Sequence, residues 1–166
     1  MIHAAAAVRR FFVFSPKWYD ELVELTLYTD YSLRVLLYLG LREDRVCQLA
    51  DIAEAYGVSR HHLLKVVQGL ARHGFVRTFR GKGGGITLAR APRDINIGRV
   101  IRLAEGPIQP VECLRGDANH CVITGACRLT RLFQEAAQNF LSTFDHVTLA
   151  DLLAHRKSQI SDLLIH

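Results

Sequence analysis

The sequence lacks the marks of a membrane, secreted or catalytic protein. No apolar run approaches the roughly 18 residues of a membrane-spanning helix, and the richest one covers only residues 35–41. Only four residues are cysteine and no clean signal-peptide cleavage site is found near the start, which argues against a secreted disulfide scaffold. Paired carboxylates, a nucleophile motif and a nucleotide-binding loop are also missing. We therefore expect a soluble cytoplasmic protein that binds no membrane and is not an enzyme.

Apolar residues and positive charge are abundant. Of the 166 residues 49% are apolar, enough for about one globular domain with a substantial core. The net charge is +5 and the isoelectric point is about 9.3, which favours a polyanionic partner. Because basic enzymes also exist, the location of the charge must decide what that partner is.

Helical periodicity and capping residues predict three helices in the first half of the chain. The first helix is expected to follow a cap at Thr29 or Asp30 and to end at Leu41. The second spans residues 48–56. The third spans residues 60–74 and is expected to bury five apolar side chains, namely Leu63, Leu64, Val67, Leu70 and Ala71.

A tight turn and a β-hairpin complete a recognisable motif. Gly57 suits the left-handed position after a helix, and Ser59 is a good N-cap for the third helix. Two short strands, residues 75–80 and 85–89, flank the glycine-rich turn GKGGG. Three helices followed by a hairpin predict a winged helix-turn-helix, within a fold that is mainly α with a small β wing.

The second half of the chain is predicted to be helical around one irregular loop. Asn96 can cap a helix over residues 97–106, and Thr148 with Asp151 resembles a capping box for a helix over residues 149–154. A long helix begins near Cys127, and its apolar stripe consists of Leu129, Leu132, Phe133, Ala136, Ala137, Phe140, Leu141 and Phe144. Packing on its own domain would cover this stripe, but we favour a homodimer interface because helix-turn-helix proteins usually bind palindromic DNA as dimers.

The start of the third helix and the wing carry the candidate DNA contacts. Exposed residues at the start of a recognition helix reach base edges and phosphates, and cations beside a glycine turn can reach the backbone. The candidates are Ser59, Arg60, His61, His62, Lys65, Arg80 and Lys82. A charged helix end is often merely solvated, but in this fold DNA contact is the stronger interpretation.

Three cysteines in the loop CLRGDANHCVITGAC indicate a metal or redox site. The gaps between Cys113, Cys121 and Cys127 are seven and five residues, longer than the two to four that zinc knuckles usually have. Zinc with His120 as a fourth ligand, a cofactor-free thiol switch and an iron–sulfur cluster all remain open on spacing alone. Cys47 has apolar neighbours and is predicted to be a buried structural thiol.

Several stretches together resemble a bacterial family of winged-helix iron–sulfur regulators. They are LTLYTDYSLRVLLYL, IAEAYGVSRHHLLKVVQGLARHGFV, RGKGGGITLA, INIGRVIRLAE and the loop ending in CVITGACRL, followed by FLSTFDHVTLADLL. The resemblance runs from about residue 24 to residue 153. It implies that Cys113, Cys121 and Cys127 ligate an iron–sulfur cluster, with a 4Fe–4S form favoured over a 2Fe–2S form.

One position separates two branches of this family. Cluster-biogenesis regulators have a histidine three residues after the last cysteine, where this chain has Thr130. This favours the branch of nitric-oxide-sensitive repressors, whose proposed fourth ligand is an aspartate of the first helix from the other subunit. The matching residue is Asp30, for which a plain helix N-cap is the simpler interpretation.

The predicted function is that of a homodimeric repressor. It would sense nitric oxide through the cluster and release a palindromic double-stranded operator on nitrosylation. The alternatives are an iron–sulfur or thiol regulator of another signal, such as iron or cluster status, and, less favoured, a cluster enzyme. We assign residues 24–106 to the DNA-binding domain, 107–127 to the cluster loop, and 128–166 to the dimerisation helix and C-terminal segment. Residues 1–23 are expected to be an N-terminal extension, for which an upstream-extended gene model is one explanation.

Overall fold

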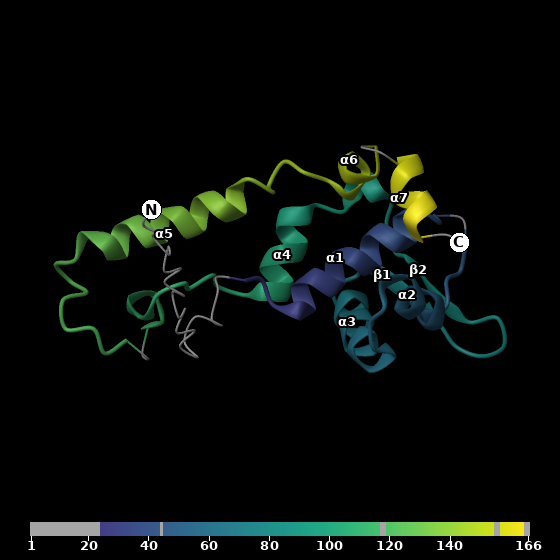
Figure 1. The fold of residues 1–166 in the computed structure, drawn as a ribbon, viewed down its shortest axis with the longest axis horizontal. Coiled ribbons are helices and arrows are strands. Elements are labelled where there is room, and N and C mark those ends of the chain that lie inside the picture. The colour runs from purple at the N-terminus through teal and green to yellow at the C-terminus, as the bar shows by residue number, and fades with distance from the viewer. Residues whose placement is uncertain (1–23, 44, 117–118, 155–156, 165–166) are drawn as a thin grey trace, which may run out of the picture.

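A computed structural model describes residues 24–43, 45–116, 119–154 and 157–164 (Figure 1). The elements in chain order are α1 (Leu27–Gly40), α2 (Leu49–Tyr56), α3 (Arg60–Arg72), β1 (Val76–Phe79), β2 (Gly85–Leu88), η2 (Pro92–Asp94), α4 (Ile97–Glu105), η3 (Glu112–Leu114), α5 (Arg128–Ser142), α6 (Leu149–Ala154) and α7 (Lys157–Leu164). The mainly helical fold with a small β wing is as predicted. The expected extension over residues 1–23 lies outside the described residues.

Helix α1 begins earlier than predicted. Thr26 is its N-cap, since the Thr26 hydroxyl accepts a hydrogen bond from the Thr29 backbone N–H at 3.3 Å. Asp30 lies in the first turn, and its backbone N–H donates to the Thr26 carbonyl at 3.0 Å. The predicted cap at Thr29 or Asp30 is therefore wrong, as is the simpler interpretation of Asp30 as a cap. Thr26, Thr29 and Asp30 are all residue types that cap helices, and their order in the sequence does not show which of them is the cap.

The other predicted caps are confirmed. Ser59 accepts a hydrogen bond from the backbone N–H two residues on at 3.2 Å, and Asn96 accepts one from the N–H three residues on at 2.8 Å. Thr148 and Asp151 bond reciprocally, with each backbone N–H donating to the other side chain, at 2.8 and 3.2 Å. Gly57 ends α2 with φ of 63°, in the left-handed region where glycine carries no Cβ penalty.

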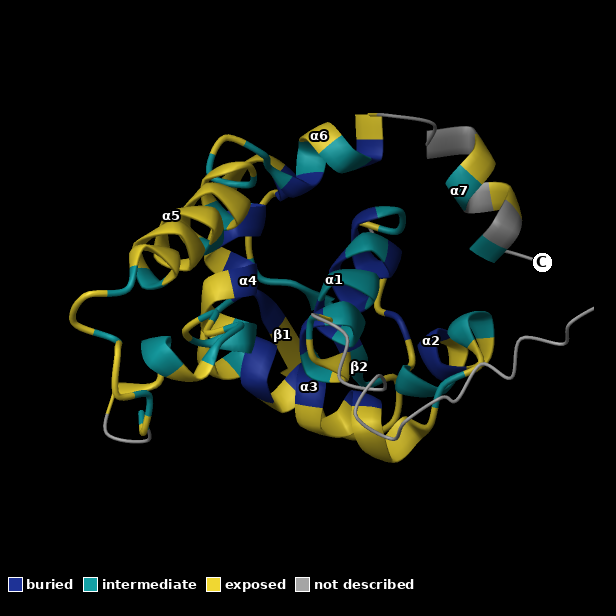
Figure 2. Cartoon of the chain, turned by 60° about the vertical axis from the view of Figure 1, so that its left-hand side comes forward, coloured by how far each residue is buried: buried dark blue, intermediate teal, exposed yellow. Residues whose placement is uncertain are grey.

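Helix α1 lies at the centre of the core. It packs against α3, α4 and α6, and much of its length is dark blue in Figure 2. Helix α3 turns Leu63, Val66, Val67 and Leu70 inward, each at most 4% exposed. Leu64 was predicted to be buried but is 46% exposed, because it lies beside this face rather than on it.

The wing is an antiparallel pair of four-residue strands. β1 pairs with β2 from Val76 opposite Leu88 to Phe79 opposite Gly85, so both strands are shorter than predicted. Cys47 continues the sheet through two backbone hydrogen bonds with Ile86, at 2.9 and 2.8 Å. The wing is thereby attached to the segment that leads into α2.

Helix α5 reaches away from the body formed by α1 to α3 (Figure 1). It begins directly after Cys127, as predicted, and none of its residues is buried. Leu141 and Phe144, at the end of the apolar stripe, pack against the core of the same chain, whereas Leu129, Leu132, Phe133 and Phe140 stay exposed. Helix α7, for which no prediction was made, follows α6. Within the described ranges no helix is long and apolar enough to cross a membrane.

Candidate nucleic-acid interface and cysteine loop

The predicted recognition-helix residues all lie on the surface. Helix α2, the left-handed Gly57 turn and α3 place the start of α3 outward, while the opposite face of α3 packs on α1. Its outer side is exposed along most of its length (Figure 2). The residues at this end, all of them exposed, are Ser59, Arg60, His61, His62 and Lys65.

Sequence reasoning missed a further residue on this surface. Leu64 is exposed between His61 and Lys65, with exposed Gln68 one turn further on. An apolar side chain on a recognition helix can contact the methyl group of thymine. Leu64 therefore belongs to the candidate interface. The sequence did carry a signal: the apolar residues at positions 63, 66, 67 and 70 already form one continuous helical face, and Leu64 lies beside that face.

The wing presents the two predicted cations at its tip. Arg80 and Lys82 are exposed in the turn between β1 and β2. A Cβ at Gly84 would lie 2.4 Å from the Phe79 carbonyl oxygen, so this tight turn requires glycine. The Gln48 side-chain amide donates to the Gly84 carbonyl. This bond gives the wing tip a second attachment to the start of α2.

Asp30, the predicted ligand from a partner subunit, is paired within its own chain. Its carboxylate, 38% exposed, accepts hydrogen bonds from Arg34 Nε at 3.0 Å and Nη2 at 2.7 Å. The Arg34 guanidinium lies 5.7 Å from the ring centroids of both Tyr31 and Tyr56. Tyr31 in turn stacks on His62 of α3, with centroids 6.4 Å apart. Contacts thus run from Asp30 to the start of the recognition helix.

The three loop cysteines are free thiols at the two ends and the middle of the loop. Cys113 lies in η3, Cys127 is the residue before α5, and all three are partly exposed. Asn119 and Thr124 shape the chain around Cys121. The Asn119 side chain accepts a hydrogen bond from the Cys121 N–H at 3.0 Å, and the Thr124 hydroxyl donates to the Cys121 carbonyl at 2.8 Å.

The part of the chain that the structure describes does not close a metal site. Within the described residues, which omit 117–118 of this loop, no three His, Cys, Asp or Glu side chains are grouped to hold a metal ion. The donor set nevertheless fits an iron–sulfur cluster, because three reduced thiols in one loop are the ligands such clusters take. The hydroxyl oxygen of Thr130 is buried and has no hydrogen-bond partner among the described residues. A threonine hydroxyl can donate a hydrogen bond to a sulfur atom.

The side chain and the backbone N–H of His120 both contact Glu112. Its Nδ1 lies 3.2 Å from Glu112 Oε1, and its backbone N–H donates to the same oxygen at 2.8 Å. The backbone hydrogen bond from His120 lowers the pKa of Glu112. His120 is thereby directed toward Glu112 in this structure.

Cys47 is the structural thiol that the sequence predicts. It is 4% exposed, lies among core residues and is bonded through its backbone to Ile86. Burial raises the pKa of its thiol, which keeps it protonated and unreactive.

A carboxylate that sequence reasoning missed ties the start of α1 to the start of the cysteine loop. Glu105, the last residue of α4, accepts hydrogen bonds from the Thr26 N–H at 3.0 Å, the Thr26 hydroxyl at 2.9 Å and the Thr29 hydroxyl at 2.5 Å. Thr29 is fully buried. This contact joins the end of α4, after which the chain runs into the cysteine loop, to the first turn of α1, which contains Asp30. No local sequence pattern signals a contact across 79 positions.

Comparison with known proteins identifies the family. The sequence profile of the Rrf2 family, described as "Iron-dependent Transcriptional regulator", matches residues 25–155. The HTH-type transcriptional regulator NsrR of Geobacillus kaustophilus is 47% identical over 137 residues, which cover 82% of this chain and 93% of that protein. The same regulator of Bacillus subtilis is 43% identical over 136 residues, covering 81% and 93%.

Solved structures agree with the fold. CymR, the global cysteine regulator of B. subtilis, matches with a TM-score of 0.66 at 27% identity, covering 81% of this chain and 98% of that one. IscR of T. potens matches with a TM-score of 0.65 at 26% identity, covering 85% and 93%. These findings confirm the resemblance drawn from the sequence, and the NsrR relatives are named as regulators of transcription rather than as enzymes. The chain belongs to the Rrf2 family of transcriptional regulators.

Proposed function

We propose that the protein is a homodimeric DNA-binding repressor that senses nitric oxide through an iron–sulfur cluster. One observation carries the proposal: three free, partly exposed thiols lie in a loop that leads directly into an uncovered apolar helix, in the same chain as a winged helix-turn-helix. The exposed cations on α3 and at the wing tip would bind a double-stranded, palindromic operator. The similarity to NsrR supports this branch of the family.

The uncovered face of α5 supports a dimer. Its exposed apolar side chains are Leu129 at 59%, Leu132 at 46%, Phe133 at 37% and Phe140 at 40%. Such a stripe on a helix without a buried residue is stabilised when a second copy covers it. A two-fold dimer would also place two recognition helices to read two half-sites.

The proposed ligands of the cluster are Cys113, Cys121, Cys127 and, from the other subunit, Asp30. A bound cluster, for which we favour the 4Fe–4S form over the 2Fe–2S form, would supply iron with which nitric oxide can react. Donating Asp30 to the partner's loop takes its carboxylate away from Arg34. Arg34 lies over Tyr31, which stacks on His62. Gain or loss of the ligand would therefore act through Arg34 and Tyr31 on His62 of the recognition helix, which gives the coupling between cluster and DNA a physical basis.

Spectroscopy of anaerobically purified protein tests the proposed function. We expect a brown protein whose visible absorbance is bleached by nitric oxide, with parallel loss of operator binding measured by fluorescence anisotropy. The family description names iron dependence, so a regulator of iron or cluster status is the second candidate. In that case iron chelation would release the DNA and nitric oxide would not. A colourless protein that binds zinc would overturn both.

Mixed dimers test whether Asp30 acts across the dimer. In the first dimer one chain carries Asp30→Ala and the other carries Cys121→Ser. In the second, both substitutions are in one chain and the other chain is wild type. Donation between chains predicts one normal cluster in the first dimer and none in the second. Donation within one chain predicts the reverse, so the pair of samples decides between the two arrangements whatever the yield of either.

A further inference from the structure

Helix α5 needs a firm attachment if a dimer through it is to place the DNA-binding heads. None of its residues is buried, and its main neighbours are α4 and η3. Its length reaches away from α1 to α3 (Figure 1). Besides these contacts, the corner formed by residues 143–148 joins the C-terminal end of α5 to the rest of the chain and can set the direction of α5 relative to the head.

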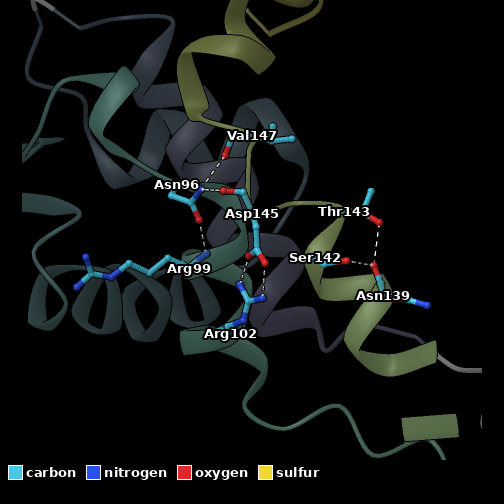
Figure 3. Close-up of polar contacts among 8 residues, drawn as sticks. All are labelled: Asn96, Arg99, Arg102, Asn139, Ser142, Thr143, Asp145 and Val147. Atoms are coloured by element: carbon cyan, nitrogen blue, oxygen red, sulfur yellow. Dashed lines mark hydrogen bonds and ion pairs between the residues drawn. The ribbon is translucent and has the colours of Figure 1, made fainter. Parts of the chain in front are cut away.

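The corner is bonded to the start of α4. The first backbone N–H groups of a helix have no acceptor within that helix. Here the Ile97 N–H donates to the Val147 carbonyl at 2.9 Å, and the Gly98 N–H donates to the Phe144 carbonyl at 3.1 Å. The Asn96 side-chain amide donates to the Asp145 carbonyl at 2.7 Å (Figure 3). Three bonds thus hold the corner backbone to one turn of α4.

An ion pair adds a side-chain contact. The two terminal nitrogens of the Arg102 guanidinium face the two oxygens of Asp145, and Nη2 donates to Oδ2 at 2.9 Å (Figure 3). Two parallel bonds between a guanidinium and a carboxylate fix relative orientation as well as distance. The hydrogen bond from Arg102 also lowers the pKa of Asp145, so the pair stays charged at neutral pH.

Gly98 makes this close approach possible. A Cβ at position 98 would lie 2.7 Å from Asp145 Oδ1, 3.0 Å from Arg102 Nη1 and 3.1 Å from the Phe144 carbonyl carbon. The last of these is backbone and cannot rotate away. An alanine at position 98 would therefore displace the Asp145–Arg102 ion pair and press on the Phe144 backbone, which must give by a few tenths of an ångström.

We propose that this joint, formed by Asn96, Gly98, Arg102 and Asp145, fixes the direction of α5 and thereby sets the half-site spacing that the dimer reads. The inference rests on the proposed function, because it takes a dimer through α5 as given. Helix α4 packs on α1, and α1 packs on α3. A change of angle at the joint therefore passes as a rigid-body rotation to the recognition helix. Because α5 is long and lies far from α3, a small rotation moves the two recognition helices apart by a larger distance.

Operator-spacing measurements on joint variants test the inference. Wild-type protein first selects duplexes from a random library, and the selected duplex is then remade with its centre shortened or lengthened by single base pairs. Gly98→Ala should remain dimeric by sedimentation but bind the selected spacing at least about tenfold more weakly, which corresponds to about 1.4 kcal/mol. Its preferred spacing should shift or broaden. A duplex carrying one half-site should bind both proteins equally.

Two further variants keep the test decisive. Asp145→Asn keeps the shape but removes the charge, and it should broaden the spacing preference even if Gly98→Ala does not fold. Ser142→Ala is the matched control, because the Ser142 hydroxyl donates to the Asn139 carbonyl within α5 at 2.9 Å and does not touch α4 (Figure 3). Wild-type spacing profiles for both joint variants, or an equal loss on the half-site duplex, would overturn the joint while leaving the repressor intact. A wild-type protein that neither dimerises nor selects a duplex would instead refute the proposed function.

Discussion

Replacing Gly69 with alanine sets two opposing effects against each other at the contact between α3 and α1. Gly69 is buried in the middle of α3, where glycine costs about 1 kcal/mol relative to alanine. A Cβ there would lie 1.7 Å from the Tyr28 hydroxyl oxygen and 3.0 Å from the ring carbon that bears it. The added methyl group therefore gains helix propensity and overpacks the contact with Tyr28.

The steric effect should win in the wild-type background. Overpacking of this kind costs about 1–3 kcal/mol, against the gain of about 1 kcal/mol from helix propensity. We expect Gly69→Ala to lower the free energy of unfolding by about 1 kcal/mol, with a fall in melting temperature of about 2–4 °C. In a Tyr28→Phe background the oxygen is absent and the nearest remaining atom is the ring carbon at 3.0 Å. There the same substitution should be neutral or stabilising.

A double-mutant cycle by urea denaturation measures the difference between the two backgrounds. The four proteins are wild type, each single variant and the double variant, and the expected coupling between the two sites is about 1–3 kcal/mol. Because the recognition helix rests on α1 here, operator affinity should fall with Gly69→Ala and recover in the double variant. An equal effect of Gly69→Ala in both backgrounds, or a stabilised Gly69→Ala single variant, would refute this account of the contact.

Three other results are expected. Cys121→Ser should abolish cluster loading in iron and sulfide assays and Cys47→Ala should not; full loading of the Cys121→Ser protein would rule out that ligand. Arg60→Ala and Lys82→Ala should weaken operator binding, and each lost phosphate contact should lower the slope of log K against log salt by about one; unchanged slopes would remove these residues from the interface. Asp145 has a lowered pKa, so its stabilising contribution is present above its unfolded value of about 4 and is lost as pH falls through the folded value. The difference in urea midpoint between wild type and Asp145→Asn should therefore be largest near neutral pH and vanish in acid, and a difference that persists in acid contradicts this.

Local chemistry explains which parts of the fold the sequence predicted. Ser59, Asn96 and Thr148 were identified as caps because each bonds a backbone group only two or three residues away. The cap of α1 was misplaced because Thr26 and Thr29 are both suitable and only Thr26 has the extended backbone of a cap. Leu64 was misplaced because periodicity marks an apolar side of a helix without fixing its edges.

Contacts between distant segments could not be predicted in this way. Arg102 and Asp145 are 43 positions apart, and Glu105 and Thr26 are 79 apart. Neither pair has a sequence signature, because such contacts depend on how helices pack rather than on local pattern. The cysteine spacing likewise left zinc, a thiol switch and a cluster open, and resemblance to a family made the choice. The ligand assignment, including Asp30, stays a prediction.

The contrast in exposure between Cys47 and the loop cysteines allows the opening of the wing to be measured by thiol labelling. In the cluster-free protein an alkylating reagent meets three partly exposed thiols at once, whereas Cys47 is 4% exposed and its raised pKa disfavours the reactive thiolate. Cys47 becomes accessible when its backbone bonds to Ile86 open and the wing separates from the start of α2. Its labelling rate, followed by mass spectrometry, therefore reports how often the wing detaches. A slower rate with operator bound would measure how strongly DNA holds the wing closed.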